Sequence, residues 1–301
     1  MQESPIAVLK KHGKSFNFAR LFLGSETGLA AARLYRFCRV IDDIADENDD
    51  KLEARKNLEE MKRAILSNAK DHPLAGDFLL LCEENNIDRR NGIILIEGVS
   101  EDLTLQAFDT EQEIIKYAFK VAGVVGLMMA PILGAKKHGY RFAIDLGIGM
   151  QLTNIARDVM EDAKMNRRYL PGAWIDSMSA QQIVLNQESQ RQCVQSAIAR
   201  LLILAEEYYH SGLAGLYYLP LRNRKSIAVA AYVYREIGRI LLKQDCIYWQ
   251  GRVMVSTPKK VSLACQALWD LSLKNIARDD ITHKDELHKY LTNVYSSNMT
   301  L

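Results

Sequence analysis

The chain has 301 residues, of which 48% are hydrophobic and 25% are charged, the composition of an ordinary globular protein with a large core. Its 39 basic and 37 acidic side chains give a formal net charge of +2, so no overall field favours nucleic acid as a partner. The five cysteines are scattered and form no CxxC pair, which favours reduced thiols and a cytoplasmic protein.

Apolar residues recur mostly at intervals of three and four, and alternating strand patterns are hard to find. Short breaks at proline and glycine separate the helical stretches, and each break is followed at once by another apolar helix, so none resembles an interdomain linker. We therefore expect one all-α domain over residues 1–301. Its polar C-terminal tail, from about residue 279, is expected to fray.

The first informative stretch is residues 30–50, AAARLYRFCRVIDDIADENDD. Because a helix turns by about 100° per residue, one of its faces carries Tyr35, Arg39, Asp42 and Asp46. The surrounding apolar residues predict a helix packed on much of its surface, where neighbouring carboxylates repel each other unless a cation joins them. Mg²⁺ prefers such oxygen ligands.

Small residues continue the same face toward the N-terminus, namely Gly28, Ala31 and Ala32. A helix face that is acidic at one end and small and apolar at the other suits an amphiphile. The carboxylates would hold metal, and the small residues would leave room for a hydrocarbon tail.

The longest apolar run, VAGVVGLMMAPILGA, covers residues 121–135. It has about 15 residues, whereas a membrane span needs about 20. It also contains three glycines and Pro131. The run therefore predicts a buried, kinked helix.

A second acidic helix is predicted over residues 142–171. One stripe along it carries Gln151, Asn154, Asp158, Glu161, Asp162 and Met165. The i, i+4, i+8 spacing of Asn154, Asp158 and Asp162 suits one metal ion or two along a helix. Arg157 lies beside the stripe within reach of a phosphate, and arginine matches phosphate oxygens with a planar fork. Ala143 and Gly147 prolong the stripe with small residues.

Together these segments resemble the squalene/phytoene synthase family, the head-to-head isoprenyl diphosphate synthases. LYRFCRVIDDIADE, from Leu34, and QLTNIARDVMEDAKMNRRYLP, from Gln151, are similar to the family's two aspartate-rich motifs. VAGVVGLMMAPIL resembles its pocket helix, HGKSF from His12 its N-terminal substrate loop, and AAYVYREI from Ala230 its late tyrosine helix. The resemblance implies an all-α isoprenoid synthase bundle with a central substrate cavity.

The resemblance also implies roles for individual residues. The implied magnesium ligands are Asp42, Asp46, Asn154, Asp158 and Asp162. The implied catalytic residues are Tyr35, Arg39, Asp42, Asp46, Asp158 and Tyr234. The implied substrate-binding residues are His12, Gly13, Lys14, Ser15, Tyr35, Arg39, Gln151, Arg157, Arg167, Tyr234 and Arg252. Lys260 is a weaker candidate for the same role, and the choice between Arg167 and Arg168 stays open.

The activity implied is a magnesium-dependent condensation of two prenyl diphosphates through a cyclopropyl diphosphate, with Mn²⁺ as an alternative metal. The small residues near Gly28 favour two geranylgeranyl diphosphates and phytoene, the precursor in carotenoid biosynthesis. Arg20 lies close to the expected tail pocket, and an inward-pointing side chain there would shorten it.

Several alternatives stay open. One is a farnesyl diphosphate-using dehydrosqualene, presqualene diphosphate or squalene synthase, of which only the last would need NADPH. A class I terpene cyclase and a non-catalytic assembly-factor relative are others, although every expected carboxylate position is filled here. An apolar product has to leave into a membrane, which a peripheral contact without a span would allow.

Overall fold

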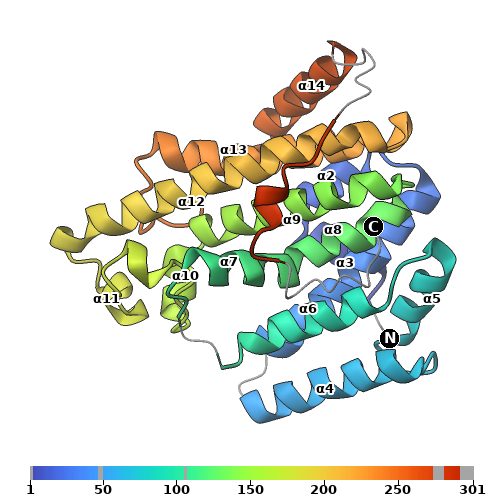
Figure 1. Cartoon of the computed structure of the whole chain (residues 1–301), viewed down its shortest axis with the longest axis horizontal. Coiled ribbons are helices and arrows are strands. Elements are labelled where there is room, and N and C mark those ends of the chain that lie inside the picture. The colour runs from blue at the N-terminus through green and yellow to red at the C-terminus, as the bar shows by residue number, and fades with distance from the viewer. Residues whose placement is uncertain (1–2, 47–49, 105–106, 274–280, 292–301) are drawn as a thin grey trace.

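A computed structural model describes residues 3–46, 50–104, 107–273 and 281–291 (Figure 1). Within these ranges the protein is all-α, and the only strand-like pairing is an isolated bridge between Ala107 and Arg168. The α-helices in the first half of the chain are α1 Pro5–His12, α2 Lys14–Arg20, α3 Ser25–Asp46, α4 Lys51–Ser67, α5 Gly76–Asn85, α6 Arg90–Glu101, α7 Glu111–Ala118 and α8 Val124–Ile132. Those in the second half are α9 Tyr140–Arg157, α10 Val159–Lys164, α11 Ala180–Leu185, α12 Glu188–Ala214, α13 Leu221–Lys243 and α14 Thr257–Leu273.

Helix α9 runs through the middle of the bundle, with α12 and α13 on one side and α8 on the other (Figure 1). Every fourth residue along it is fully buried, at Ile144, Ile148 and Leu152, because this spacing returns to one face of a helix. The apolar face of α9 therefore anchors the core, while its other faces are left for polar side chains.

The predicted buried, kinked helix is confirmed, and it begins earlier than residue 121. Helix α7 starts at a capping box of Thr110 and Glu113, and it continues through a π-helical turn, η1 Phe119–Gly123, into α8. Residues Glu111–Ile132 are together long and apolar enough to cross a membrane, but 56% of the tested window is buried inside the protein. The π-turn marks the point where the helix meets α9.

Two glycines let this helix and α9 approach each other at the level of the backbone. A Cβ atom on Gly147 would lie 2.3 Å from the carbonyl oxygen of Ala122, and one on Gly126 would lie 2.1 Å from that of Ala143. Neither contact can be relieved by rotating a side chain, because the opposing atom belongs to the backbone. Glycine is therefore needed at both positions for the helices to pack this closely.

The expectation that the C-terminal tail frays is wrong for residues 281–291. This segment folds back onto the bundle, where the hydroxyls of Tyr218 and Tyr208 donate to the carbonyls of Ile281 (3.0 Å) and Leu287 (2.9 Å). Leu291 is buried as well. The polar composition of the segment concealed these contacts, and residues 292–301 lie outside the described part of the chain.

We expect Gly147→Ala to destabilise the protein by about 1–3 kcal/mol, because the added methyl group forces two helix backbones apart. Thermal unfolding would show this as a lower Tm. Gly28→Ala on α3 is the matched control, since its Cβ would meet nothing closer than 3.4 Å and alanine favours a helix. Equal Tm values for the two variants would contradict the close approach.

Candidate active site

A cavity of about 290 Å³ lies between α2, α3, α8, α9 and α13. Its walls are mostly apolar, with Leu34, Val125, Met129, Leu146 and Ile227 among them. Polar side chains also line it, notably Tyr35, Gln151, Asn154 and Tyr234. The predicted central cavity is therefore present, and it is bordered by both of the helices that carry the aspartates.

Only some of the small residues expected along the cavity actually line it. Ala31, Ala143 and Gly147 line it as expected. Gly28 and Ala32 are buried but do not line it, so this part of the expectation was wrong. Gly28 instead faces the preceding turn, because a Cβ atom there would lie 3.4 Å from Cγ of Arg20.

Arg20, at the end of α2, is itself one of the lining residues. Its guanidinium donates to the side-chain carbonyl of Asn17 through Nε (3.4 Å) and Nη2 (3.5 Å). It therefore lies where the sequence indicated that an inward side chain would shorten the tail pocket.

The segment His12–Ser15, expected as a loop, is instead the junction of two helices. His12 ends α1, Gly13 alone interrupts the helix, and Lys14 and Ser15 begin α2. A Cβ atom on Gly13 would lie 2.9 Å from the ring of Tyr35. The junction thus packs directly on a residue that lines the cavity.

Asp42, Asp43 and Asp46 lie in the last two turns of α3, as predicted. Asp43 forms an ion pair with Arg39 one turn earlier. Asp46 accepts a hydrogen bond from Nη1 of Arg167 at 2.9 Å, which links the end of α3 to the segment after α10. The two acidic motifs are therefore in direct contact.

The second acidic motif is not the single straight helix that was expected. Asp158 has non-helical backbone angles (φ −102°, ψ 15°) and separates α9 from α10. The backbone hydrogen bonds Asp158 N–Asn154 O (2.9 Å) and Asp162 N–Asp158 O (2.8 Å) persist. The chain therefore bends at Asp158 without breaking, and the polar stripe changes direction there.

Two arginines clamp Asp158. Arg157 donates to its two carboxylate oxygens at 2.7 and 2.5 Å, and Arg252 does so at 2.8 and 2.6 Å. Arg252 comes from the segment between α13 and α14, about a hundred residues further along the chain. Planar guanidinium pairs of this kind also match the oxygens of phosphate groups.

Arg167 and Arg168, between which the sequence left the choice open, have different partners. Arg168 is buried, and its Nη1 donates to the carbonyls of Phe108 (2.6 Å) and Leu170 (2.8 Å). Its role is to hold the chain after α10 in place. Arg167, which contacts Asp46, is the arginine that faces the acidic motifs.

Burial disfavours the ionised form of two of the acidic side chains. It raises the pKa of Asp42 from 3.8 to about 7, with the charge of Asp46 adding to the effect. Burial likewise raises the pKa of Asp162 to about 8, with Asp158 as the next contributor. A cation bound between these carboxylates would remove the penalty.

Asn154 completes a set of oxygen donors. Its Nδ2 donates to Oε1 of Gln151 at 3.4 Å, whereas its Oδ1 is buried and has no hydrogen-bond partner among the described residues. A buried amide oxygen without a partner is costly unless something binds it. Beside carboxylates on the same helix, it fits a hard cation such as Mg²⁺.

Asp102, at the end of α6, was missed from the sequence. It accepts hydrogen bonds from the hydroxyls of Tyr117 and Tyr169, both at 2.8 Å, and burial raises its pKa to about 6. Its charge also raises the pKa values of Asp42 and Asp162. No spacing connects it to either motif, so only the tertiary fold shows that it belongs to the same cluster.

Two tyrosines of the cavity flank the ring of Phe16. The ring centroids of Tyr35 and Tyr234 lie 6.1 and 4.9 Å from that of Phe16. Burial raises the pKa of Tyr35 to about 12 and also raises that of Tyr234, so both hydroxyls stay protonated near neutral pH.

Lys260, the weaker candidate from the sequence, lies on α14 and is buried. Its pKa is lowered by burial and, next, by the charge of Lys14. Two lysines that repel each other beside the α1–α2 junction provide positive charge for an anion.

Comparison with known proteins agrees with this geometry. The family model for squalene/phytoene synthase matches residues 9–259. The 15-cis-phytoene synthase of Enterobacter agglomerans is 34% identical over 277 residues, which cover 88% of this chain and 94% of that protein. The 15-cis-phytoene synthase of Pantoea ananas is 33% identical, with 84% and 86% covered.

Solved structures give the same answer for the fold. A dehydrosqualene synthase in complex with ligand superposes with a TM-score of 0.80 at 26% identity, covering 89% of this chain and 95% of that one. A squalene synthase from Alicyclobacillus acidocaldarius has a TM-score of 0.69 at 20% identity, with 80% and 94% covered.

The fold, the apolar cavity and the two acidic motifs beside it define an all-α isoprenoid synthase. The chain belongs to the squalene/phytoene synthase family, as its motifs indicated. It is a prenyltransferase, and the prediction of an enzyme that joins prenyl diphosphates head to head is confirmed.

The raised pKa values predict how the stability of the metal-free protein depends on pH. Between pH 4 and 8 the unfolded chain releases protons that folded Asp42 and Asp162 retain, so stability falls as the pH rises. The fall should exceed about 1 kcal/mol, the equivalent of one pKa unit. Chemical denaturation in a chelating buffer at several pH values measures it.

The double variant Asp42→Asn, Asp162→Asn separates these groups from the other titrating residues. Its stability should depend less on pH over the same interval, because neither amide releases a proton. Identical pH profiles for the variant and the parent chain would show that these carboxylates are not the source.

Proposed function

We propose that this enzyme condenses two molecules of geranylgeranyl diphosphate to phytoene, with Mg²⁺ as its metal. The observation that carries the proposal is the pairing of two acidic motifs, joined by Arg167 and Asp46, beside an apolar cavity. Relatives that carry the name phytoene synthase, at 33–34% identity over most of the chain, support the same substrate class.

The residues that would hold the metal share side-chain oxygen donors and come from the end of α3, from α9 and from α10 with the residue between them. They are Asp42, Asp46, Asn154, Asp158 and Asp162. When bound there, Mg²⁺ would neutralise the charge of the diphosphate and make it a better leaving group. The raised pKa values and the unpaired oxygen of Asn154 support this donor set.

The arginines would bind the diphosphate. The guanidiniums of Arg157 and Arg252 both donate to the carboxylate of Asp158. If Asp158 held a cation, these donors would be available for phosphate oxygens. Arg39, Arg167, Lys14 and Lys260 would add positive charge around the same group, with His12, Gly13 and Ser15 beside it.

The cavity would hold the hydrocarbon and exclude water. Departure of diphosphate leaves an allylic cation that water would quench, so a mostly apolar wall protects it. Tyr35 and Tyr234 remain protonated in this cavity, and their oxygens would face the developing charge. Gln151, which also lines the cavity, holds the amide of Asn154.

Farnesyl diphosphate is the second candidate substrate, and one observation favours it. Arg20 lines the cavity, where it would shorten the space for a tail. NADPH would be needed only if the final product were squalene.

A competition assay distinguishes the two substrates. With Mg²⁺ and equal amounts of both diphosphates, we expect phytoene as the main product, identified by chromatography and mass. Exclusive formation of a product from farnesyl diphosphate would overturn the proposed substrate. The variant Glu59→Gln, at an exposed position on α4, should behave like the parent chain and controls for handling.

Asn154→Ala tests the metal site. If Oδ1 is a ligand, the Mg²⁺ concentration for half-maximal activity should rise by about 10-fold or more. The stability of the metal-free protein should change little, because the variant removes a buried acceptor that has no partner and only one long hydrogen bond, to Gln151. A loss of stability with unchanged Mg²⁺ dependence would contradict the assignment.

A further inference from the structure

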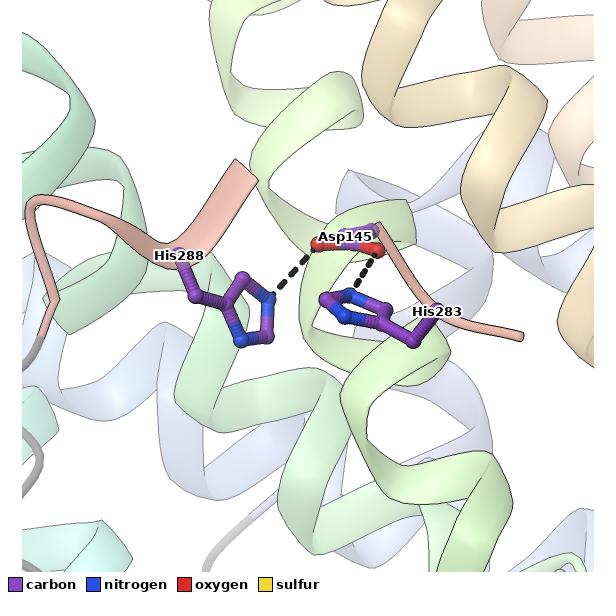
Figure 2. A group of neighbouring side chains, drawn as sticks. All are labelled: Asp145, His283 and His288. Atoms are coloured by element: carbon purple, nitrogen blue, oxygen red, sulfur yellow. Dashed lines mark hydrogen bonds and ion pairs between the residues drawn. The ribbon is translucent and has the colours of Figure 1, made fainter. Parts of the chain in front are cut away.

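Three side chains outside the catalytic cavity converge where the C-terminal segment crosses α9 (Figure 2). They are Asp145 on α9 and His283 and His288, five residues apart on the segment 281–291. Figure 2 shows both imidazole rings directed at the same carboxylate. None of the three is used in the proposed condensation.

The cluster is enclosed and its atoms are close together. Nε2 of His283 lies 2.9 Å from Oδ2 of Asp145, and Nε2 of His288 lies 2.8 Å from Oδ1. The carboxylate is fully buried, and the two imidazoles are 5% and 13% exposed. All three potential ligand atoms lie within 4.8 Å of one another.

A second layer of contacts orients these groups. Nδ1 of His283 lies 3.3 Å from Oδ1 of Asp285, which itself pairs with Arg141 at 2.6 Å. The hydroxyl of Ser211 donates to Oδ2 of Asp145 at 2.5 Å. In metalloproteins, a histidine ligand commonly donates its other ring nitrogen to a carboxylate, and ligating carboxylates are hydrogen-bonded in turn.

We propose that Asp145, His283 and His288 bind a divalent transition-metal ion, for which Zn²⁺ is the probe, and that this ion fastens segment 281–291 to α9. Two imidazoles and one carboxylate are a common ligand set for zinc and fill three of its four tetrahedral positions, and a water molecule would take the fourth. The role assigned to the ion is structural because its ligands join segment 281–291 to α9 and the cluster is enclosed.

The geometry needs a small adjustment to receive the ion. Ligand atoms around tetrahedral zinc are separated by about 3.3 Å, given bonds of about 2.0–2.1 Å. The nitrogen–oxygen pairs at 2.8 and 2.9 Å would therefore open by about half an ångström. Because the two imidazoles contact different oxygens of Asp145 and the ligand atoms lie within 4.8 Å of one another, the rings would also shift toward a common point. The hydrogen bonds of Tyr208 and Tyr218 anchor the segment independently, so its course would be retained.

The competing explanation is that the three side chains only form hydrogen bonds with one another. A measurement of zinc binding distinguishes this explanation from a metal site. The purified full-length chain would be stripped with a chelator, supplied with excess Mg²⁺ to occupy the acidic motifs, and titrated with Zn²⁺ by calorimetry. We expect the His283→Gln and His288→Gln variants to bind one equivalent of zinc fewer than the parent. His210→Gln, at an exposed position on α12, should match the parent.

Two measurements on the parent chain test the proposal even if the variants fail to fold. Co²⁺ in place of zinc should give visible absorption bands typical of nitrogen and oxygen ligands, and zinc should raise the Tm by several degrees in excess Mg²⁺. Equal zinc stoichiometry in the parent and both folded histidine variants would overturn the proposal. So would a parent chain that binds no zinc when Mg²⁺ is present. Neither outcome depends on whether phytoene is the product.

Discussion

The interaction on which the site depends is the mutual repulsion of carboxylates that the fold brings together, some of them buried. Three segments of the chain contribute to this cluster, which consists of Asp42, Asp46, Asp102, Asp158 and Asp162. Arg157, Arg167 and Arg252 neutralise part of the charge. Burial first, and then the charge that remains, raise the pKa values of Asp42 and Asp162. This is a free-energy cost that bound cations would relieve.

The helices that carry the aspartates also line the cavity. This shared support would fix the position of a substrate's diphosphate relative to its hydrocarbon tail. Helix α9 is held against η1 and α8 at backbone distance by Gly126 and Gly147. Such contacts cannot slide without a clash between backbone atoms. The small residues therefore do more than leave room for a hydrocarbon, since they also set the spacing of the helices on which the ligands are mounted.

Local patterns in the sequence were enough to predict the helical fold and the two acidic motifs. Residues four apart on a helix share a face wherever that helix ends up, so the stripe from Tyr35 to Asp46 needed no tertiary information. The bend at Asp158, the inward side chain of Arg20 and the contribution of Asp102 depend on which helices meet. No periodicity encodes those contacts, and the polar composition near residue 283 even argued against packing.

Helix α9 carries two polar sites with different chemistry. Near its C-terminus it offers carboxylate and amide oxygens, which suit Mg²⁺, whereas the cluster at Asp145 adds two imidazoles, which suit zinc. If both proposals hold, the two sites would take up different ions from the same solution. Asp145 and Asn154 are separated by nine residues, or about 14 Å along the axis, too far for their side chains to touch. Any influence of segment 281–291 on the diphosphate site must therefore pass through the position of α9 itself.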